Sequence, residues 1–317
     1  MEQAAKSGIA KEPRTGYFLS DREGFLGGVF LAPAVLYIAL LVALPFVLAI
    51  IFSMSDITVG DASLDFVGLD NFERVIRTPQ FRRALSNTFV FTIVAQFFII
   101  VLSNILALVL SENFRGKWIA RLLIILPWAT PISLGTIGWK WIFDSKFSPI
   151  DWILVQLGLL GPDTLFGPST HLTFLGKEYL AMASVTLVHI WRLLPLATVI
   201  LLAGLASIDQ DLIDQAKVDG AGPWRIHFRI RIPLVLPILS IALLFGLIFT
   251  FGDMVVVFVL TRGGPVYYTQ MLSLWAWFKG IDGGSLGEGA AIALFLFPIL
   301  LVVALLILRS ARRTEYA

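Results

Sequence analysis

Six apolar segments constrain this chain more than any other feature of its sequence, because each is about 20 residues long or longer. They lie near residues 26–52, 87–111, 120–143, 179–205, 234–260 and 287–308. A helix of this length crosses the hydrocarbon core of a bilayer and pairs its backbone N–H and C=O groups internally. The sequence therefore predicts an all-α, polytopic membrane protein with six transmembrane helices.

The composition agrees with this prediction and excludes several kinds of site. Hydrophobic residues make up 57% of the chain and charged residues only 15%, whereas about a quarter of the residues of a globular domain are charged. The chain has no cysteine, which excludes disulfides and thiolate metal sites. The first apolar segment follows a polar leader and is too long for a signal peptide, so we interpret it as a membrane span.

The distribution of Lys and Arg predicts the orientation. An even number of spans places both termini on one side of the membrane, and positive charge is retained on the cytoplasmic side. Basic residues are more numerous in the segments that would be inner, although the outer loop 53–86 alone holds four arginines. The prediction is therefore N-in and C-in. The expected parts are a partly disordered cytoplasmic segment 1–25, a transmembrane domain 26–308 and a cytoplasmic tail 309–317.

A polar, basic segment, 214–237, separates the fourth and fifth apolar segments. Gly220 permits a sharp chain reversal, and Pro223 suits the first turn of a new helix. On that helix Trp224 and Phe228 are four residues apart and share one face. The pattern predicts a short amphipathic helix whose aromatic side chains insert into a groove on another protein.

The same segment resembles the cytoplasmic loop of ABC-importer permeases, which reads Glu-Ala-Ala, three residues, Gly, nine residues, Ile-x-Leu-Pro. The matching residues here are Asp214, Gln215, Ala216, Gly220, Ile230, Ile232 and Pro233. The spacing is the same, while Asp for Glu, Gln for Ala and Ile for Leu are departures. Asp214 keeps the negative charge on a shorter side chain, and Pro233 marks the start of the next apolar segment.

Three further motifs resemble the carbohydrate-transporting branch of this family. They are Phe-Val-Gly-Leu-Asp-Asn-Phe at 66–72, Leu-Pro-Trp-Ala-Thr-Pro at 126–131, and Leu-Thr-Arg-Gly-Gly-Pro at 260–265. The resemblance extends from about residue 28 to residue 308. On spacing alone, the first motif is equally compatible with an ordinary amphipathic surface loop.

This resemblance implies a permease subunit of an ATP-driven ABC importer, in the cytoplasmic (inner) membrane of a bacterium, that translocates a di- or oligosaccharide. The implied partners are a second homologous permease subunit, two ATP-binding cassette subunits, an extracytoplasmic sugar-binding protein or lipoprotein, and membrane lipid, but no nucleic acid. Coupling to the ATPase would use a cytoplasmic helix in the loop 209–233. The residues implied for coupling are Asp214, Ala216, Gly220, Trp224, Phe228, Ile230 and Pro233.

The sequence offers no catalytic motif of its own. It has no Gly-x-x-x-x-Gly-Lys-Ser/Thr loop, so ATP and Mg are expected on the partner ATPase subunits. The three histidines, His171, His189 and His227, are scattered and show no metal-binding spacing. We therefore expect a protein that is not itself an enzyme and that holds no metal or cofactor.

Polar residues inside the predicted spans are the candidates for substrate contact. His189 and Arg192 share one face of the fourth span, and Thr250 and Asp253 share one face of the fifth. An Arg at the centre of a span costs about 2.5–3.5 kcal/mol and needs a partner or an aqueous cavity, so we expect Arg192 to pair with Asp253.

The third span supplies an aromatic candidate. Pro127 and Pro131 each remove a backbone hydrogen bond, which predicts a kinked or broken helix. Trp128 lies beside this kink and corresponds, by the family resemblance, to a position that contacts sugar. Carbohydrate sites often combine an aromatic ring with polar groups that bind hydroxyls in pairs. The predicted substrate-binding residues are Trp128, His189, Arg192, Thr250 and Asp253.

Alternatives remain open for each of these residues and for the function. Arg192 and Asp253 could form only a structural ion pair, while His189 and Trp128 could pack in the core and Thr250 could bond its own helix. The rival functions are import of glycerol-phosphate or amino-sugar compounds by the same kind of importer, and proton-coupled secondary transport.

Overall fold

A computed structural model describes residues 23–61 and 63–315, with side chains for 26–61 and 63–309. Most of the predicted cytoplasmic segment 1–25, and the tail beyond Arg309 apart from its helical backbone, lie outside these residues. The chain divides into two compact units, Met1–Ile51 and Phe52–Ala317. The described part of the first unit contains α1 (Glu23–Ile38), a π-helical turn η2 (Ala39–Ala43) and the beginning of α2 (Leu44–Ser53), so the predicted segment 26–52 is helical.

The second unit consists of helices and connecting loops. Its described elements are α3 (Asp70–Arg77), α4 (Pro79–Ser111), α5 (Lys117–Ala129), α6 (Ile132–Ile142), α7 (Pro149–Gln156), α8 (Glu178–Ala206), α9 (Gln210–Val218), α10 (Pro223–Ile226), η3 (His227–Arg231), α11 (Ile232–Phe251), α12 (Val255–Leu260), α13 (Leu272–Trp277), η4 (Phe278–Asp282), α14 (Leu286–Leu294) and α15 (Leu296–Glu315). The described residues contain only isolated β-bridges and no strand. The all-α prediction is confirmed.

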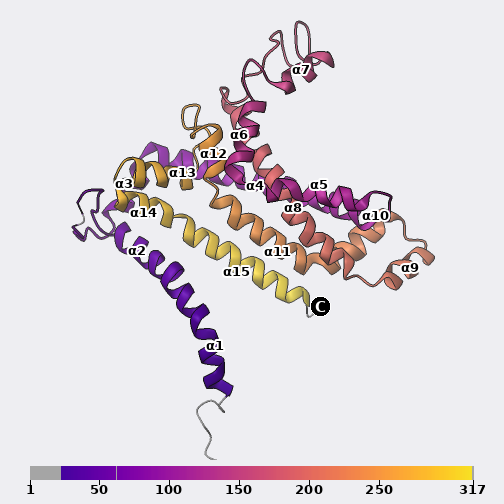
Figure 1. Ribbon diagram of the computed structural model, residues 1–317, viewed down its shortest axis with the longest axis horizontal. Coiled ribbons are helices and arrows are strands. Elements are labelled where there is room, and N and C mark those ends of the chain that lie inside the picture. Colours follow the sequence, from indigo (N-terminus) through magenta and orange to yellow (C-terminus); the bar gives the residue numbers. More distant parts are fainter. Residues whose placement is uncertain (1–22, 62, 316–317) are drawn as a thin grey trace, which may run out of the picture. The chain divides into compact units, whose positions relative to one another are not determined.

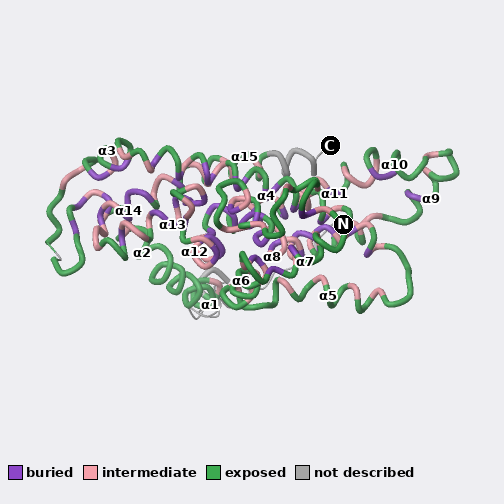
Figure 2. Tube along the Cα trace, turned by 90° about the horizontal axis from the view of Figure 1, so that it is seen from above, coloured by how far each residue is buried: buried purple, intermediate pink, exposed green. Residues whose placement is uncertain are grey.

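The long helices α4, α8, α11 and α15 form the body of this unit (Figure 1). Helix α4 packs along α8, and α11 packs against both α8 and α15. Buried residues concentrate where these helices meet, whereas the α9–α10 end is mostly exposed (Figure 2). One apolar cluster joins α4, α8 and α12 through Phe91, Val185 and Val256, and another joins α13 to α14 through Trp275 and Ile292.

Helix α4 shows how the sequence sets the length of a span. It contains no Gly, and its one Pro is in the first turn, where the missing N–H leaves no bond unmade. Its 33 residues measure about 50 Å, which exceeds the roughly 30 Å hydrocarbon thickness of a bilayer. The helix begins eight residues before the predicted span at 87–111, and a helix of this length extends beyond the hydrocarbon.

The third predicted span, 120–143, is broken as expected. Helices α5 and α6 meet at an angle of 98°. The break falls at Thr130 and Pro131, whereas Pro127 remains inside α5. Five described helices are long and apolar enough to cross a membrane, or up to six if this bent pair counts as one span.

The fifth predicted span, 234–260, is not a single helix. Helix α11 ends at Phe251, Gly252 and Asp253 follow, and α12 begins at Val255. At its other end the helix starts earlier than predicted, because α10, η3 and α11 run on without interruption from Pro223. In the sixth span, α14 and α15 are separated only at Phe295, and Leu286–Arg309 still counts as one helix long enough to cross a membrane.

Single cysteines should report the orientation, because the native chain has none. We expect Val218→Cys to react with an impermeant maleimide only from the cytoplasmic side, and Leu165→Cys only from the outer side. Both side chains are highly exposed. Ala291→Cys, at a buried position, should stay unlabelled from either side. Labelling of Val218→Cys from outside would overturn the N-in, C-in orientation.

Candidate functional site

A buried polar network joins α8 to the break between α11 and α12. His189 Nδ1 lies 2.5 Å from Asp253 Oδ2, and His189 Nε2 lies 2.9 Å from Thr250 Oγ1. All three side chains are buried. The sequence placed them on two separate spans, and the fold brings them into direct contact. Such a network is stable in an apolar interior because its polar groups satisfy one another.

Arg192 extends this network towards the surface. Its Nη1 lies 3.5 Å from Asp253 Oδ2, and its side chain keeps about a fifth of its surface exposed. Arg192 lies one turn beyond His189 on α8, so both reach the same carboxylate. The ion pair expected from the sequence is present, but His189 makes the shorter contact to Asp253.

Gln96 is a member of the network that the sequence reasoning missed. Its Nε2 donates to Thr250 Oγ1 over 2.7 Å, which ties α4 to α11. A Cβ at Gly246 would overlap the Gln96 side-chain oxygen, so a larger residue there would displace the Gln96 amide. Gln96 is one of very few polar residues in an apolar stretch of α4, and that isolation was the available signal.

The Asp253 residue also organises the break in the fifth span. Its Oδ1 accepts a hydrogen bond of 3.3 Å from the Val256 N–H, in the first turn of α12. Its backbone carbonyl accepts one of 2.9 Å from Ser273 Oγ. Irregular backbone at membrane depth is tolerated where protein groups satisfy it. Asp253 therefore holds the break, α8 and α13 together.

Trp128 lies apart from the other predicted site residues. It stays in α5, where its ring meets Phe249 edge-on at 5.7 Å between centroids, and it is 37% exposed. No contact joins it to His189, Arg192 or Asp253 in the part of the chain that the structure describes. Its assignment to sugar contact stays a prediction.

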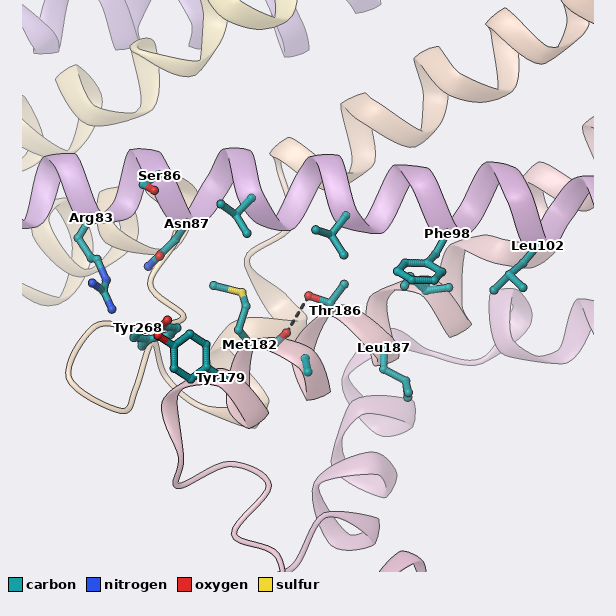
Figure 3. Close-up of a pocket in the computed structure, with 14 residues that line it drawn as sticks. Arg83, Ser86, Asn87, Phe98, Leu102, Tyr179, Met182, Thr186, Leu187 and Tyr268 are labelled. Carbon is teal, nitrogen blue, oxygen red and sulfur yellow. Dashed lines mark hydrogen bonds between the residues drawn. The ribbon is translucent and has the colours of Figure 1, made fainter. Parts of the chain in front are cut away.

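A groove of about 660 Å³ lies between α4 and α8 (Figure 3). Its lining residues are Arg83, Ser86, Asn87, Val90, Val94, Phe98, Leu102, Tyr179, Met182, Ala183, Thr186, Leu187, Ile190 and Tyr268. Arg83, Tyr179 and Tyr268 gather at one end, and Phe98 and Leu102 lie towards the other. None of the five predicted substrate-binding residues lines this groove.

The segment predicted to contact another protein begins with a capped helix. Asp209 accepts a hydrogen bond of 3.0 Å from the Asp211 N–H and so caps α9. Gly220 adopts φ +78°, a left-handed conformation that glycine allows without strain, and reverses the chain after α9. Hydrogen bonds from Lys217 (2.8 Å) and Gln210 lower the pKa of the exposed Asp214.

Trp224 and Phe228 form an exposed aromatic pair beyond this reversal. Their rings are stacked, with centroids 5.8 Å apart and planes 9° apart, and the residues are 77% and 58% exposed. The shared face predicted from their spacing is confirmed. The predicted short helix is, however, continuous with α11.

The π-helical turn η3 explains this continuity. The Ile232 N–H bonds to the His227 carbonyl, five residues earlier, and Pro233 follows. Pro233 has no N–H and cannot donate a backbone hydrogen bond. In this wider turn that bond is not needed, so the helix continues. Turn η2 ends in the same way, with a bond from Leu44 to the Ala39 carbonyl before a proline.

Comparisons with known proteins agree with this architecture. Residues 99–316 match the family described as "Binding-protein-dependent transport system inner membrane component". The chain is 31% identical to a probable ABC transporter permease of Brucella suis biovar 1 (strain 1330), over 77% of this chain and 82% of that protein. It is 29% identical to the trehalose/maltose transport system permease protein MalF of Thermococcus litoralis, over 93% and 96%.

One further relative in sequence and one solved structure are also similar to this chain. The sulfoquinovosyl glycerol transport system permease protein SmoG of Agrobacterium fabrum is 28% identical, over 96% of each chain. A chain in the crystal structure of a bacterial alginate ABC transporter, in complex with an alginate pentasaccharide-bound periplasmic protein, superimposes with a TM-score of 0.76. It is 21% identical, with coverage of 91% of this chain and 94% of that one, so the likeness concerns the fold.

Proposed function

This chain belongs to the family of inner-membrane components of binding-protein-dependent transport systems, and on that premise we propose that it carries a di- or oligosaccharide across the cytoplasmic membrane as the permease subunit of an ABC importer. The observation that carries the sugar assignment is the set of relatives, whose names refer to trehalose and maltose, sulfoquinovosyl glycerol and diacetylchitobiose.

Three kinds of partner complete the proposed importer. An extracytoplasmic binding protein delivers the sugar, a second permease subunit completes the path, and two ATPase subunits on the cytoplasmic side bind ATP and Mg. This permease is not itself an enzyme. The exposed stack of Trp224 and Phe228, in the segment between α9 and α11, supplies the surface that the ATPase binds. Aromatic side chains that protrude into a partner's groove commonly carry most of the contact energy.

The α4–α8 groove is the proposed surface along which the sugar passes. It follows two of the long apolar helices and carries polar groups among its lining residues, including Asn87 and Thr186. Its volume lies within the usual range for small-molecule sites, about 300–1,000 Å³. Asn87 donates to two carbonyls of the 261–271 loop, whereas Thr186 Oγ1 donates to the Met182 carbonyl and keeps a lone pair that can accept.

The predicted substrate residues have two distinct roles in this proposal. Arg192 and Trp128 keep exposed surface outside the α4–α8 groove, where a sugar can reach them directly. His189, Thr250 and Asp253 are buried and act through Arg192, by fixing the carboxylate that orients its guanidinium. The fifth span carries the coupling segment at one end and Asp253 at the other. Its movement therefore transmits the action of the ATPase to the network around Asp253.

Filling the groove should test its role. We expect Val94→Trp to lower ATP-driven sugar uptake about tenfold, equivalent to about 1.4 kcal/mol in the barrier to passage, because the added ring occupies space that the sugar needs. The assay is uptake into vesicles that hold the complete importer, with a panel of sugars. Ile93→Trp is the matched control, since Ile93 is exposed on the same helix and does not line the groove.

The same assay separates the rival functions. Uptake that survives ATP depletion but collapses with the proton gradient would favour a secondary transporter. Uptake of glycerol-phosphate or amino-sugar compounds alone would reassign the cargo. Equal uptake by Val94→Trp and Ile93→Trp would remove the groove from the path while leaving the importer assignment intact.

A further inference from the structure

A second cavity, of about 460 Å³, opens at the end of the α4–α8 groove where α4 and α8 begin. The two cavities share Arg83, Tyr179 and Tyr268, and the second is also lined by Gln80 and Glu178. They therefore form one continuous depression. By the predicted orientation, this mouth faces the outer side of the membrane.

The mouth presents an open aromatic surface. Tyr179 is 78% exposed, and its ring meets that of Tyr268 edge-on, with centroids 5.3 Å apart. The Arg83 guanidinium lies over the Tyr268 ring, 4.2 Å from its centroid. The Tyr268 ring face and the Arg83 guanidinium therefore contact each other, whereas most of the surface of Tyr179 remains available to a ligand.

Arg83 is fixed by stacking rather than by an ion pair. Within the described part of the chain, none of the ion pairs involves Arg83. A guanidinium held over an aromatic ring makes its contact through the ring face, so its N–H groups are left to donate to a ligand. Glu178 lines the same mouth and supplies the complementary acceptors.

The loop that carries Tyr268 is held rigidly by α4. Asn87 Nδ2 donates to the carbonyls of Tyr267 and Gln270, each over 3.0 Å. Within the loop the hydroxyls of Thr261 and Thr269 lie 2.6 Å apart. Tyr268 is thereby set in place before any ligand arrives, which lowers the entropy that binding must overcome.

We propose that Tyr179, Arg83 and Glu178, with Tyr268 as their support, form an outer subsite for an uncharged sugar ring. This inference rests on the proposed function and names the substrate class at its outer end. The apolar face of the sugar packs on Tyr179, and a pair of hydroxyls bonds to the Arg83 donors and the Glu178 acceptors. Because one acid accompanies one base, the mouth offers no net charge to select an anionic sugar.

The test measures sugar transported per ATP hydrolysed in vesicles that hold the complete importer and its binding protein. Tyr179→Ala should lower this ratio about tenfold, because sugar released at the mouth is no longer retained. Tyr179→Phe, which keeps the ring, should stay within about twofold of the parent. Phe147→Ala is the matched control, since Phe147 is equally exposed and lines neither cavity.

A second pair of variants tests the chemical class. Arg83→Met and Glu178→Gln should each lower uptake of a neutral disaccharide about tenfold, by removing a charged partner of its hydroxyls. If Arg83→Met impairs only a uronic-acid disaccharide, the site is anion-selective and the uncharged class is wrong. If Arg83→Met acts only in vesicles containing anionic lipid while Tyr179→Ala has no effect, Arg83 binds a lipid headgroup and the proposal is overturned.

Failure of this inference is distinguishable from failure of the proposed function. Absence of ATP-driven sugar uptake by the parent importer would refute the function, and the subsite with it. Normal uptake by the parent, together with an unchanged ratio of sugar to ATP in Tyr179→Ala, would refute the subsite alone.

Discussion

Replacing Phe228 by Asp is expected to abolish ATP-driven uptake while basal ATP hydrolysis by the assembled importer continues. Phe228 and Trp224 form an exposed stack that the fold leaves without internal cover. Loss of an aromatic anchor from an interface typically costs 2 kcal/mol or more, which is about 30-fold in affinity. The measurement is ATP hydrolysis with and without sugar-loaded binding protein, alongside uptake.

Two companion variants sharpen this prediction. Val218→Asp places the same charge on the exposed surface of α9, at a residue that is neither in the aromatic stack nor among the predicted coupling residues, and should couple normally. Gly220→Pro should uncouple as Phe228→Asp does, because proline cannot adopt the φ of +78° found at this reversal. Normal stimulated uptake by both Phe228→Asp and Gly220→Pro would exclude the segment from energy coupling.

Replacing Asp253 by Asn is expected to destabilise the subunit strongly. The carboxylate contacts His189 and Arg192 and also accepts a hydrogen bond from the Val256 N–H in the first turn of α12. Breaking a buried pair by removing one partner typically costs 3–5 kcal/mol, because the remaining charge is left uncompensated. We expect a lower unfolding temperature in detergent and a lower yield of assembled importer.

A double variant separates lost pairing from lost substrate contact. Adding Arg192→Met to Asp253→Asn removes the uncompensated charge, so the double variant should be more stable than Asp253→Asn alone. Arg192→Met by itself should keep assembly and reduce uptake, since Arg192 is the partly exposed member. If Asp253→Asn, His189→Ala and Trp128→Ala all retain the parental half-saturation and maximum rate of uptake, these residues take no part in substrate handling.

Local sequence chemistry predicted the features that depend on one segment. The apolar segments, the break at Pro131, the reversal at Gly220 and the shared face of Trp224 and Phe228 all follow from residues close together in the chain. The Phe251-Gly252-Asp253 sequence also contains a signal for a helix end, since Gly and Asp both favour one. Hydropathy nevertheless predicts a continuous span over 234–260, because the residues around this signal are apolar.

Features that depend on contacts between helices could not be predicted. Helical spacing shows which residues share a face, but it does not show which face of another helix they meet. Gln96 and Thr250 are 154 positions apart in the chain and bond directly. The α4–α8 groove likewise arises from the pairing of two helices, and no single residue in it departs from an ordinary membrane helix.

The bend between α5 and α6 has a consequence for how the protein is made. The two helices have 13 and 11 residues, or about 20 and 17 Å of rise, and neither alone crosses a hydrocarbon layer of about 30 Å. Counted as one span, this stretch would have to insert as a single apolar segment before it bends. Bending must then follow insertion and draw on contacts with later segments, because α5 packs on α8 and α6 on α12. The contacts that hold the bent form are complete only once the chain has been synthesised as far as Leu260, the end of α12.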